Sequence, residues 1–186
     1  MRVFIAIEPP DALKGEIAQW IETLARAIPD PKRRLHWVKK EQLHLTLKFL
    51  GETKPDLLPL LAEALRNAGQ EAASFPLSFA KVGHFGGRVI WLGIDAGANQ
   101  CANIAKSIDA ACHALGFELE SRPFSPHITL ARAKENPGNL HIAQLPPALI
   151  HRTFGPFTVT GFSLIQSTLT PKGAIYRPLE RFTFNG

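Results

Sequence analysis

One tetrapeptide pattern occurs twice in this chain, as His44-Leu45-Thr46-Leu47 and as His127-Ile128-Thr129-Leu130. Side chains of a β-strand alternate between its two faces, so each copy would turn its histidine and threonine to one side and its apolar residues toward a core. A single copy is common on half-buried strands. Two copies in the same register, at matching points of two similar halves, predict related lobes that bring both histidines and both threonines around one groove.

The hydrophobic periodicity of the segments around the two copies predicts the element order β-α-β-β-α, which occurs twice along the chain. Strands are expected at residues 2–7, 35–38, 43–50, 75–82, 88–94, from 127, at 157–166 and at 175–184. Helices are expected at residues 11–28, 55–69 and 98–115, with stops at Pro29-Asp30-Pro31, Gly69 and Gly116, and residues 134–150 are expected to be an irregular connection. The order predicts an α+β protein with helices packed on sheets, one domain over residues 1–186 whose two halves are equivalent lobes.

Composition places the chain among globular proteins. Its hydrophobic share of 45% is too high for a disordered chain, and its apolar stretches are too short for a membrane span. The N-terminal apolar run is also too short for a signal peptide. Cys101 and Cys112 lie too far apart along one expected helix to pair, and two free thiols favour a reducing, cytoplasmic location. A net charge of +5 fits a polyanionic partner and fits mere solubility equally well.

The repeated residue types suit chemistry at a phosphodiester. Two imidazoles can supply a general base and a general acid near neutral pH, because the ordinary histidine pKa is about 6.5. Two threonine hydroxyls can donate hydrogen bonds to the non-bridging phosphate oxygens. A metal site is the weaker hypothesis, because the histidines lack a helical His-x-x-x-His spacing and no Asp or Glu sits beside either motif. The phosphate-loop pattern Gly-Lys-Ser/Thr is absent as well, and no metal or cofactor is expected.

The sequence resembles the 2H phosphoesterase superfamily, and within it the bacterial and archaeal RNA 2′,3′-cyclic phosphodiesterases, also called the 2′-5′ RNA ligase family. The resemblance rests on both motifs and on segments spread along the chain: Arg2-Val3-Phe4-Ile5-Ala6-Ile7, Trp37-Val38, Lys48-Phe49-Leu50-Gly51, Val89-Ile90-Trp91-Leu92-Gly93, Arg122-Pro123-Phe124-Ser125-Pro126, Ala131-Arg132, Gln166-Ser167 and Tyr176-Arg177-Pro178-Leu179. It implies two pseudo-symmetric lobes of antiparallel sheet with helices on the outer faces. It also implies metal-independent opening of a 2′,3′-cyclic phosphate at an RNA end to leave a 2′-phosphate. We expect a monomer with no obligate protein partner and no membrane partner.

The same resemblance assigns roles to the motif residues. His44 matches the general acid that protonates the leaving 3′ oxygen, and His127 matches the base that activates water. Thr46 and Thr129 match the hydroxyls that hold the phosphate. Run in reverse, with an RNA 5′-hydroxyl as nucleophile, the same pair would join RNA ends, although abundant water favours hydrolysis.

Three neighbouring residues are further candidates for substrate binding. Lys48 shares the parity of His44 and could approach the phosphate, but a solvated strand lysine is an equal alternative. Arg132 matches a substrate contact of the family, although regular alternation would point it away from the groove. Phe49 could stack on a terminal base, whereas its parity with the motif leucines favours core packing.

Other basic and aromatic residues have more ordinary explanations. The run Lys32-Arg33-Arg34, with Lys39 and Lys40, could follow an RNA backbone or form a solvated loop. The remaining histidines are expected to be structural or exposed, and the three tryptophans to pack in the core. They are His36, His84, His113, His141, His151, Trp20, Trp37 and Trp91.

Two other functional hypotheses remain open. One keeps the chemistry and changes the substrate to a small cyclic nucleotide or an ADP-ribose cyclic phosphate. The other is a non-catalytic module that binds RNA ends. Intact His and Thr in both motifs disfavour the binding module, because binding alone does not need two proton-transfer groups.

Overall fold

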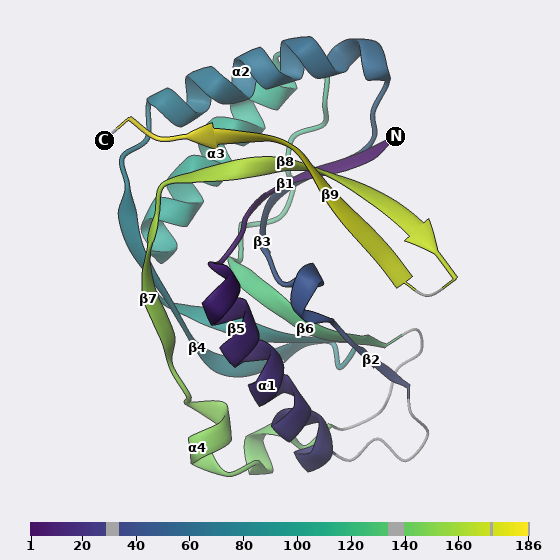
Figure 1. Ribbon diagram of the computed structural model, residues 1–186, viewed down its shortest axis with the longest axis vertical. Helices are drawn as coiled ribbons and strands as arrows, with labels where there is room; N and C mark the ends of the chain where they lie inside the picture. The colour runs from purple at the N-terminus through teal and green to yellow at the C-terminus, as the bar shows by residue number, and fades with distance from the viewer. Residues whose placement is uncertain (29–33, 134–139, 172, 186) are drawn as a thin grey trace.

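The computed structural model describes residues 1–28, 34–133, 140–171 and 173–185 (Figure 1). The strands are β1 (Arg2–Ile7), β2 (Leu35–Trp37), β3 (Leu45–Glu52), β4 (Phe75–Phe85), β5 (Val89–Ala96), β6 (His127–Ala133), β7 (Phe154–Val159), β8 (Gly161–Thr170) and β9 (Gly173–Thr183). The helices are α1 (Asp11–Ala27), α2 (Leu58–Gln70), α3 (Ala98–His113) and the short α4 (Pro147–Ile150). Short 3-10 turns lie at Lys40–Gln42, Pro55–Leu57 and Ile142–Gln144.

The strands form one curled antiparallel sheet in the order β7-β4-β5-β6-β3-β1-β8-β9, with β2 added on β6. We call β3-β1-β8-β9 the first lobe and β6-β5-β4-β7 with β2 the second lobe. Within the described residues the two lobes meet at one register pair, Leu45 opposite Ile128. The predicted α+β fold of two lobes of antiparallel sheet is confirmed, and the two motif strands are the ones that join the lobes.

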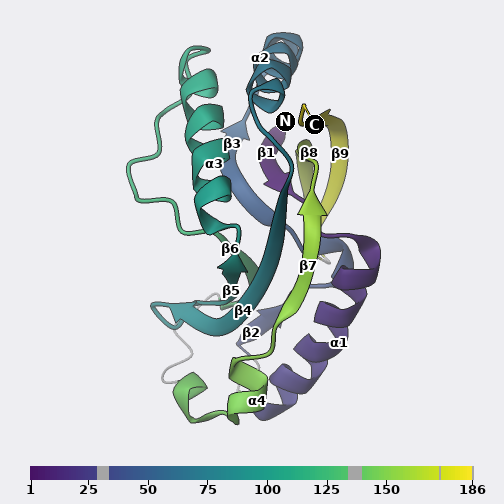
Figure 2. The same cartoon turned by 90° about the vertical axis from the view of Figure 1, so that its left-hand side faces the viewer.

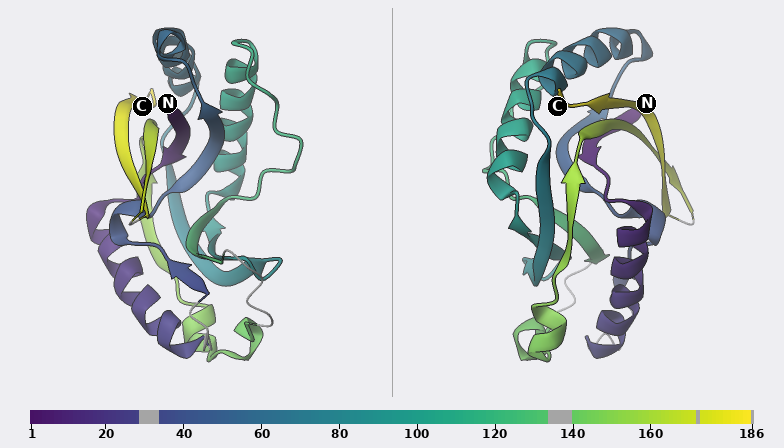
Figure 3. Two further views of the ribbon diagram at one scale, coloured as in Figure 1. Left: turned by 90° about the vertical axis from the view of Figure 1, so that its right-hand side faces the viewer. Right: turned by 60° about the vertical axis from the view of Figure 1, so that its left-hand side comes forward.

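The lobes are not the two halves of the sequence, so that part of the prediction is wrong. β1 pairs with β8 from the end of the chain, and β2 from the first half pairs with β6. The helices exchange as well: α1 follows β1 but contacts β7, and α3 follows β5 but contacts β3. Figures 2 and 3 show α3 and α2 beside the first lobe and α1 beside β7. Each lobe is therefore covered by a helix that enters from the other.

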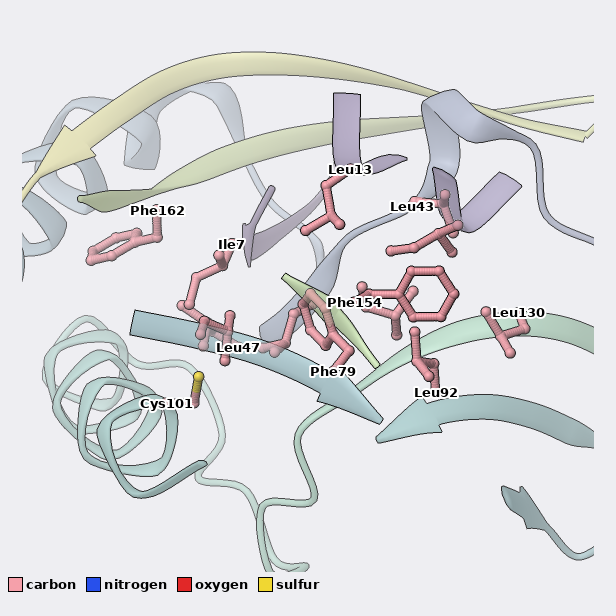
Figure 4. Packing of buried hydrophobic residues seen from close by; sticks show 14 of the residues in the cluster. Ile7, Leu13, Leu43, Leu47, Phe79, Leu92, Cys101, Leu130, Phe154 and Phe162 are labelled. Atoms are coloured by element: carbon pink, nitrogen blue, oxygen red, sulfur yellow. The ribbon is translucent and has the colours of Figure 1, made fainter. Parts of the chain in front are cut away.

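One hydrophobic core extends through both lobes (Figure 4). Alternate residues of β1 enter it, since Val3, Ile5 and Ile7 are buried against the helices. The other face of β1 carries Phe4 and Ala6, which belong to a separate small apolar cluster. Helix α1 adds an apolar stripe of residues three and four apart, among them a fully buried tryptophan. Burying each such large side chain stabilises the fold by about 1.5–3 kcal/mol.

Several predicted boundaries shift for local reasons. The strand expected at residues 157–166 is two strands, β7 and β8, which belong to different lobes and are separated at Thr160. Gly69 does not stop α2. It is buried inside that helix, where an added Cβ would lie 3.3 Å from the Thr183 carbonyl oxygen, so close packing explains the glycine. Gly51 lies within β3 at φ +69°, a left-handed conformation that favours glycine.

Some of the predictions concern residues that the structure does not describe. The helix stop at 29–31 and the basic residues Lys32 and Arg33 lie outside the described residues. Of the connection expected at 134–150, residues 140–150 hold a 3-10 turn and α4, and the rest lies outside the described part.

The two cysteines are free and buried on α3. Burial raises the pKa of Cys101 to about 12 and that of Cys112 to about 11. Both thiols stay protonated at neutral pH, so they behave as small apolar residues.

Candidate active site

The two motifs lie on one face of the sheet, opposite the hydrophobic core. Leu45 and Ile128 face one another across the lobe junction and are fully buried. In an antiparallel pair the flanking residues also oppose one another, which places Thr46 beside His127. By the same register His44 lies beside Thr129. We call this side of the sheet the motif face. It is where the structure brings the four motif side chains together.

Both histidines are held in the same way. His44 Nδ1 lies 2.7 Å from the Gln42 carbonyl oxygen, and His127 Nδ1 lies 2.7 Å from the Ser125 carbonyl oxygen. A carbonyl oxygen only accepts, so each Nδ1 must carry the hydrogen and donate it. The tautomer is thereby fixed, and each Nε2 is left to accept or donate a proton.

Burial makes both imidazoles weaker bases than in water. It lowers the pKa of His44 from 6.5 to about 4, a fall opposed by the bond to the Gln42 carbonyl and aided by the positive charge of Arg132. The pKa of His127 is lowered chiefly by burial, and again Arg132 adds to the fall. One guanidinium therefore acts on both rings. In the absence of an anion both histidines are neutral at pH 7, and a bound phosphate would raise both pKa values.

Aromatic rings fix the orientation of each histidine. Tyr176 of β9 meets His44 edge-on at 5.2 Å between ring centroids, and the ring of Phe4 contacts His44 at 4.7 Å. In the second lobe Phe85 meets His127 edge-on at 5.0 Å. The contact of Tyr176 with His44 was not foreseen from the sequence, because the pairing of β1 with β8 and of β8 with β9 is what brings the C-terminal tyrosine to the first motif.

A β-bulge reverses the expected directions of Lys48 and Phe49. In the pairing of β3 with β1, Thr46 faces Ala6 and Lys48 faces Ile5, so Leu47 is the extra residue. Lys48 points to the core side and is 2% exposed. Its Nζ lies 2.6 Å from Asp109 Oδ1 of α3 and also donates to the Glu118 carbonyl oxygen at 2.8 Å. Both expectations for Lys48, an approach to the phosphate and a solvated strand lysine, are therefore wrong, and the lysine instead fixes α3 beneath the sheet.

The same bulge places Phe49 on the motif face. Phe49 pairs with Phe4 across β1, with ring centroids 6.1 Å apart, and is 60% exposed. Core packing, the favoured expectation for Phe49, is therefore wrong. The ring also borders a pocket of about 410 Å³ formed with residues 116–122.

A second bulge turns Arg132 onto the motif face. In the pairing of β6 with β5, Thr129 faces Trp91 and Arg132 faces Val89, so Leu130 is the extra residue. Arg132 Nη2 donates to Thr129 Oγ1 at 3.2 Å. Strict alternation would have directed Arg132 into the core. The bulge at Leu130 turns it to the motif face instead.

Two other residues belong to the motif face, and one of them, Trp91, departs from the expectation of core packing. Trp91 is half-buried opposite Thr129 and outside the hydrophobic core, and an added Cβ at Gly83 would lie 2.2 Å from its ring. Gly83 therefore makes room for the indole. His36 of β2 is exposed opposite Arg132. The position of His36 depends on the pairing of β2 with β6, and no local sequence pattern indicates that these two strands pair.

The basic segment before the first motif is partly tied to the fold. Lys40 Nζ lies 2.7 Å from Asp11 Oδ2 of α1. Gln42, two residues before His44, donates from Nε2 to the Ala174 carbonyl oxygen of β9 at 2.8 Å. This segment thus links the first motif to the strand that carries the tyrosine.

Among residues 1–28, 34–133, 140–171 and 173–185, no group of three or more His, Cys, Asp or Glu side chains is placed to hold a metal ion. No helix within those residues is long and apolar enough to cross a membrane.

Comparison with known proteins gives consistent matches. The family model of the 2'-5' RNA ligase superfamily matches residues 9–170. RNA 2',3'-cyclic phosphodiesterases from Archaeoglobus fulgidus and Methanocaldococcus jannaschii are 31% and 32% identical, over 98% of this chain and 99% and 100% of their own lengths. Among solved structures, TT0787 of Thermus thermophilus superposes with a TM-score of 0.79 at 30% identity, covering 98% of this chain and 97% of that one. LigT of E. coli complexed with 3'-AMP superposes with a TM-score of 0.77 at 28% identity, covering 100% of this chain and 98% of that one.

Proposed function

The chain belongs to the 2'-5' RNA ligase superfamily, and on that basis we propose that it opens 2′,3′-cyclic phosphates at RNA ends. The observation that carries the proposal is the pair His44 and His127, each with Nδ1 held by a backbone carbonyl two residues earlier and Nε2 left to exchange a proton. The relatives named RNA 2',3'-cyclic phosphodiesterase match nearly end to end and support the same activity.

The proposed reaction divides the proton transfers between the two imidazoles. His127 Nε2 takes a proton from water while the water oxygen forms a bond to phosphorus. The bond from phosphorus to the ribose 3′ oxygen breaks, and His44 Nε2 gives its proton to that oxygen. The product carries a 2′-phosphate and a free 3′-hydroxyl, and solvent resets the two protons. No metal is needed in this scheme, because the imidazoles serve both the nucleophile and the leaving group.

The threonines and the arginine would hold the phosphate. Thr46 and Thr129 are half-buried on the motif face, where their hydroxyls can donate to the non-bridging oxygens. Arg132 lies against Thr129 and would add a charge-assisted hydrogen bond. A bound phosphate anion also raises the pKa of His44, which lets it carry the proton that the leaving oxygen needs. Lys48 has no part in this scheme, because it is paired on the other face.

Phe49 would contact the terminal nucleoside. Its exposed ring stands on the motif face next to Phe4, which itself contacts His44. A base stacked on this ring would extend from a ribose whose phosphate lies between the histidines.

The same site could join RNA ends when an RNA 5′-hydroxyl replaces water as the nucleophile. Its oxygen would form the bond to phosphorus while the 3′ oxygen leaves, giving a 2′-5′ linkage, and cleavage of that linkage would exchange the acid and base roles of the histidines. Water is far more concentrated than RNA ends, so hydrolysis is the main proposed direction. The two buried free cysteines fit a reducing compartment, and we place the activity in the cytoplasm, carried out by a monomer.

The test is incubation with an RNA oligonucleotide ending in 2′,3′-cyclic phosphate, with and without a metal chelator. The proposal expects a 2′-phosphate product in both samples. A 3′-phosphate product, a strict metal requirement or tight binding without turnover would contradict it. Competition between the oligonucleotide and mononucleoside 2′,3′-cyclic phosphates or an ADP-ribose cyclic phosphate then distinguishes RNA from the small-molecule substrates.

A further inference from the structure

The two motifs are alike in backbone but differ in the charges around their histidines. Each histidine has the same carbonyl bond and an aromatic edge contact. His44 also has Glu8 and Lys14 close enough for their charges to act on it, with opposite signs. Among the described residues, the charge that acts on His127 is that of Arg132, which acts on His44 as well.

The strand register places Glu8 next to His44. The ladder between β1 and β3 ends with Ile7 opposite Leu45, and the next residues outward are Glu8 and His44. Alternation continued one residue past β1 gives Glu8 the parity of Ala6, whose side chain belongs to the apolar cluster of the motif face, and the charge of Glu8 does act on His44.

Lys14 is joined to the same carboxylate. It lies in the first turn of α1, and its Nζ is 3.5 Å from Glu8 Oε1. The lysine side chain is 13% exposed and that of Glu8 is 27% exposed, so water screens the pair only partly. Among the described residues, the charge of Arg132 also acts on His44 and the phenol ring of Tyr176 also contacts it.

We propose that the Glu8–Lys14 ion pair sets the charge beside His44 alone: Glu8 is a positioning residue that stabilises the protonated form of His44, and Lys14 opposes that stabilisation. A carboxylate beside an imidazole favours the imidazolium, and the ammonium bound to the carboxylate weakens the effect. This rests on the proposed function, in which His44 has to carry a proton to the leaving oxygen and the Glu8 carboxylate favours that protonated state. The difference between the two histidines is set outside the repeated motif.

The test compares Glu8→Gln with Lys14→Gln, which remove opposite charges from one ion pair. The ring protons of His44 and His127 are followed by NMR across a pH titration. Glu8→Gln should lower the pKa of His44 and Lys14→Gln should raise it, while His127 moves little in either variant. In turnover of a cyclic-phosphate RNA end, Glu8→Gln should lower kcat about tenfold for each unit by which the pKa of His44 falls. KM should change little. The matched control is Glu63→Gln, which removes an exposed carboxylate from α2.

Shifts of His44 in the same direction in both variants, or equal shifts of both histidines, would overturn the assignment. So would a Glu8→Gln variant that changes KM and leaves kcat and the titration of His44 untouched. Wild-type protein that opens no cyclic phosphate would contradict the proposed function instead, and the titrations would still report whether the ion pair acts on His44.

Discussion

Phe49 and Arg132 occupy equivalent positions in the two motifs. Each is the fifth residue after its motif histidine, and each follows a β-bulge, at Leu47 in β3 and at Leu130 in β6. The bulge adds a residue to one strand, so the following side chain changes face. The first lobe thus presents an aromatic ring to the motif face, and the second presents a guanidinium. A base and a phosphate would be received by corresponding positions of the two lobes.

Replacing Arg132 should weaken catalysis and also change both histidines. Arg132→Ala removes a charge-assisted donor, so kcat/KM for a cyclic phosphate should fall about tenfold to a hundredfold. The pKa values of His44 and His127 should both rise, because Arg132 lowers each of them. Kinetics and NMR titration check this, with Arg26→Ala on α1 as the exposed control. Arg132→Lys should recover only part of the rate, because lysine lacks the planar fork. Full activity in Arg132→Ala would remove the residue from the site.

Phe49→Ala should affect substrates that carry a base. Stacking of a base on an aromatic ring contributes about 1–3 kcal/mol, so KM for a nucleotide substrate should rise about fivefold or more. A ribose 2′,3′-cyclic phosphate without a base should be hydrolysed equally well by the variant and the wild type. Leu60→Ala removes a similarly exposed apolar side chain from α2 and serves as the control. Equal loss on both substrates would contradict stacking.

Lys48 should matter for stability and not for substrate binding. Lys48→Met removes the ion-pair partner of Asp109. Loss of one member of a buried ion pair costs about 3 kcal/mol, and the cost is somewhat smaller here because Asp109 keeps some contact with water and the hydrogen bond from the Glu120 amide. Urea denaturation should show the loss, and Lys48→Met with Asp109→Leu should recover much of it. KM of the folded variant should be unchanged. A raised KM with unaltered stability would place Lys48 at the substrate after all.

The sequence predicted the elements and the shared face of the motifs because both depend on local periodicity. His44 with Thr46, and His127 with Thr129, are only two residues apart, so alternation holds between them. It failed at the next residues, because a bulge depends on how the partner strand pairs. One signal was available: strict alternation would have buried Arg132 without a partner, at a cost that favours a bend.

The arrangement of the lobes could not be read from local pattern. The pairing of β2 with β6 and of β8 with β1 joins segments far apart in sequence, and several antiparallel arrangements satisfy the same alternation. For that reason Tyr176 and Phe85, which orient the two histidines, were not recognised as neighbours of the motifs.

Acid should destabilise the protein partly through His44. Its pKa is about 4 in the folded protein and about 6.5 when unfolded. Between these values the unfolded chain binds more protons, so this contribution to stability is complete above pH 6.5 and is lost as the pH falls toward 4. The free energy of unfolding of His44→Gln should depend less steeply on pH over this range, with His151→Gln at an exposed position as the control. An unchanged slope in His44→Gln would show that the imidazole is not held neutral by burial.

The central claim is that His44 and His127 exchange protons at one cyclic phosphate. The most direct measurement follows the opening of an RNA 2′,3′-cyclic phosphate by phosphorus NMR in the wild type, His44→Gln and His127→Gln. Each substitution should lower kcat at least a hundredfold, the lower end of what a positioned acid or base contributes, while circular dichroism shows the folded state retained. The wild type should yield the 2′-phosphate. A folded variant of either histidine that keeps near-normal turnover, or a wild-type product phosphorylated at the 3′ position, would contradict the account.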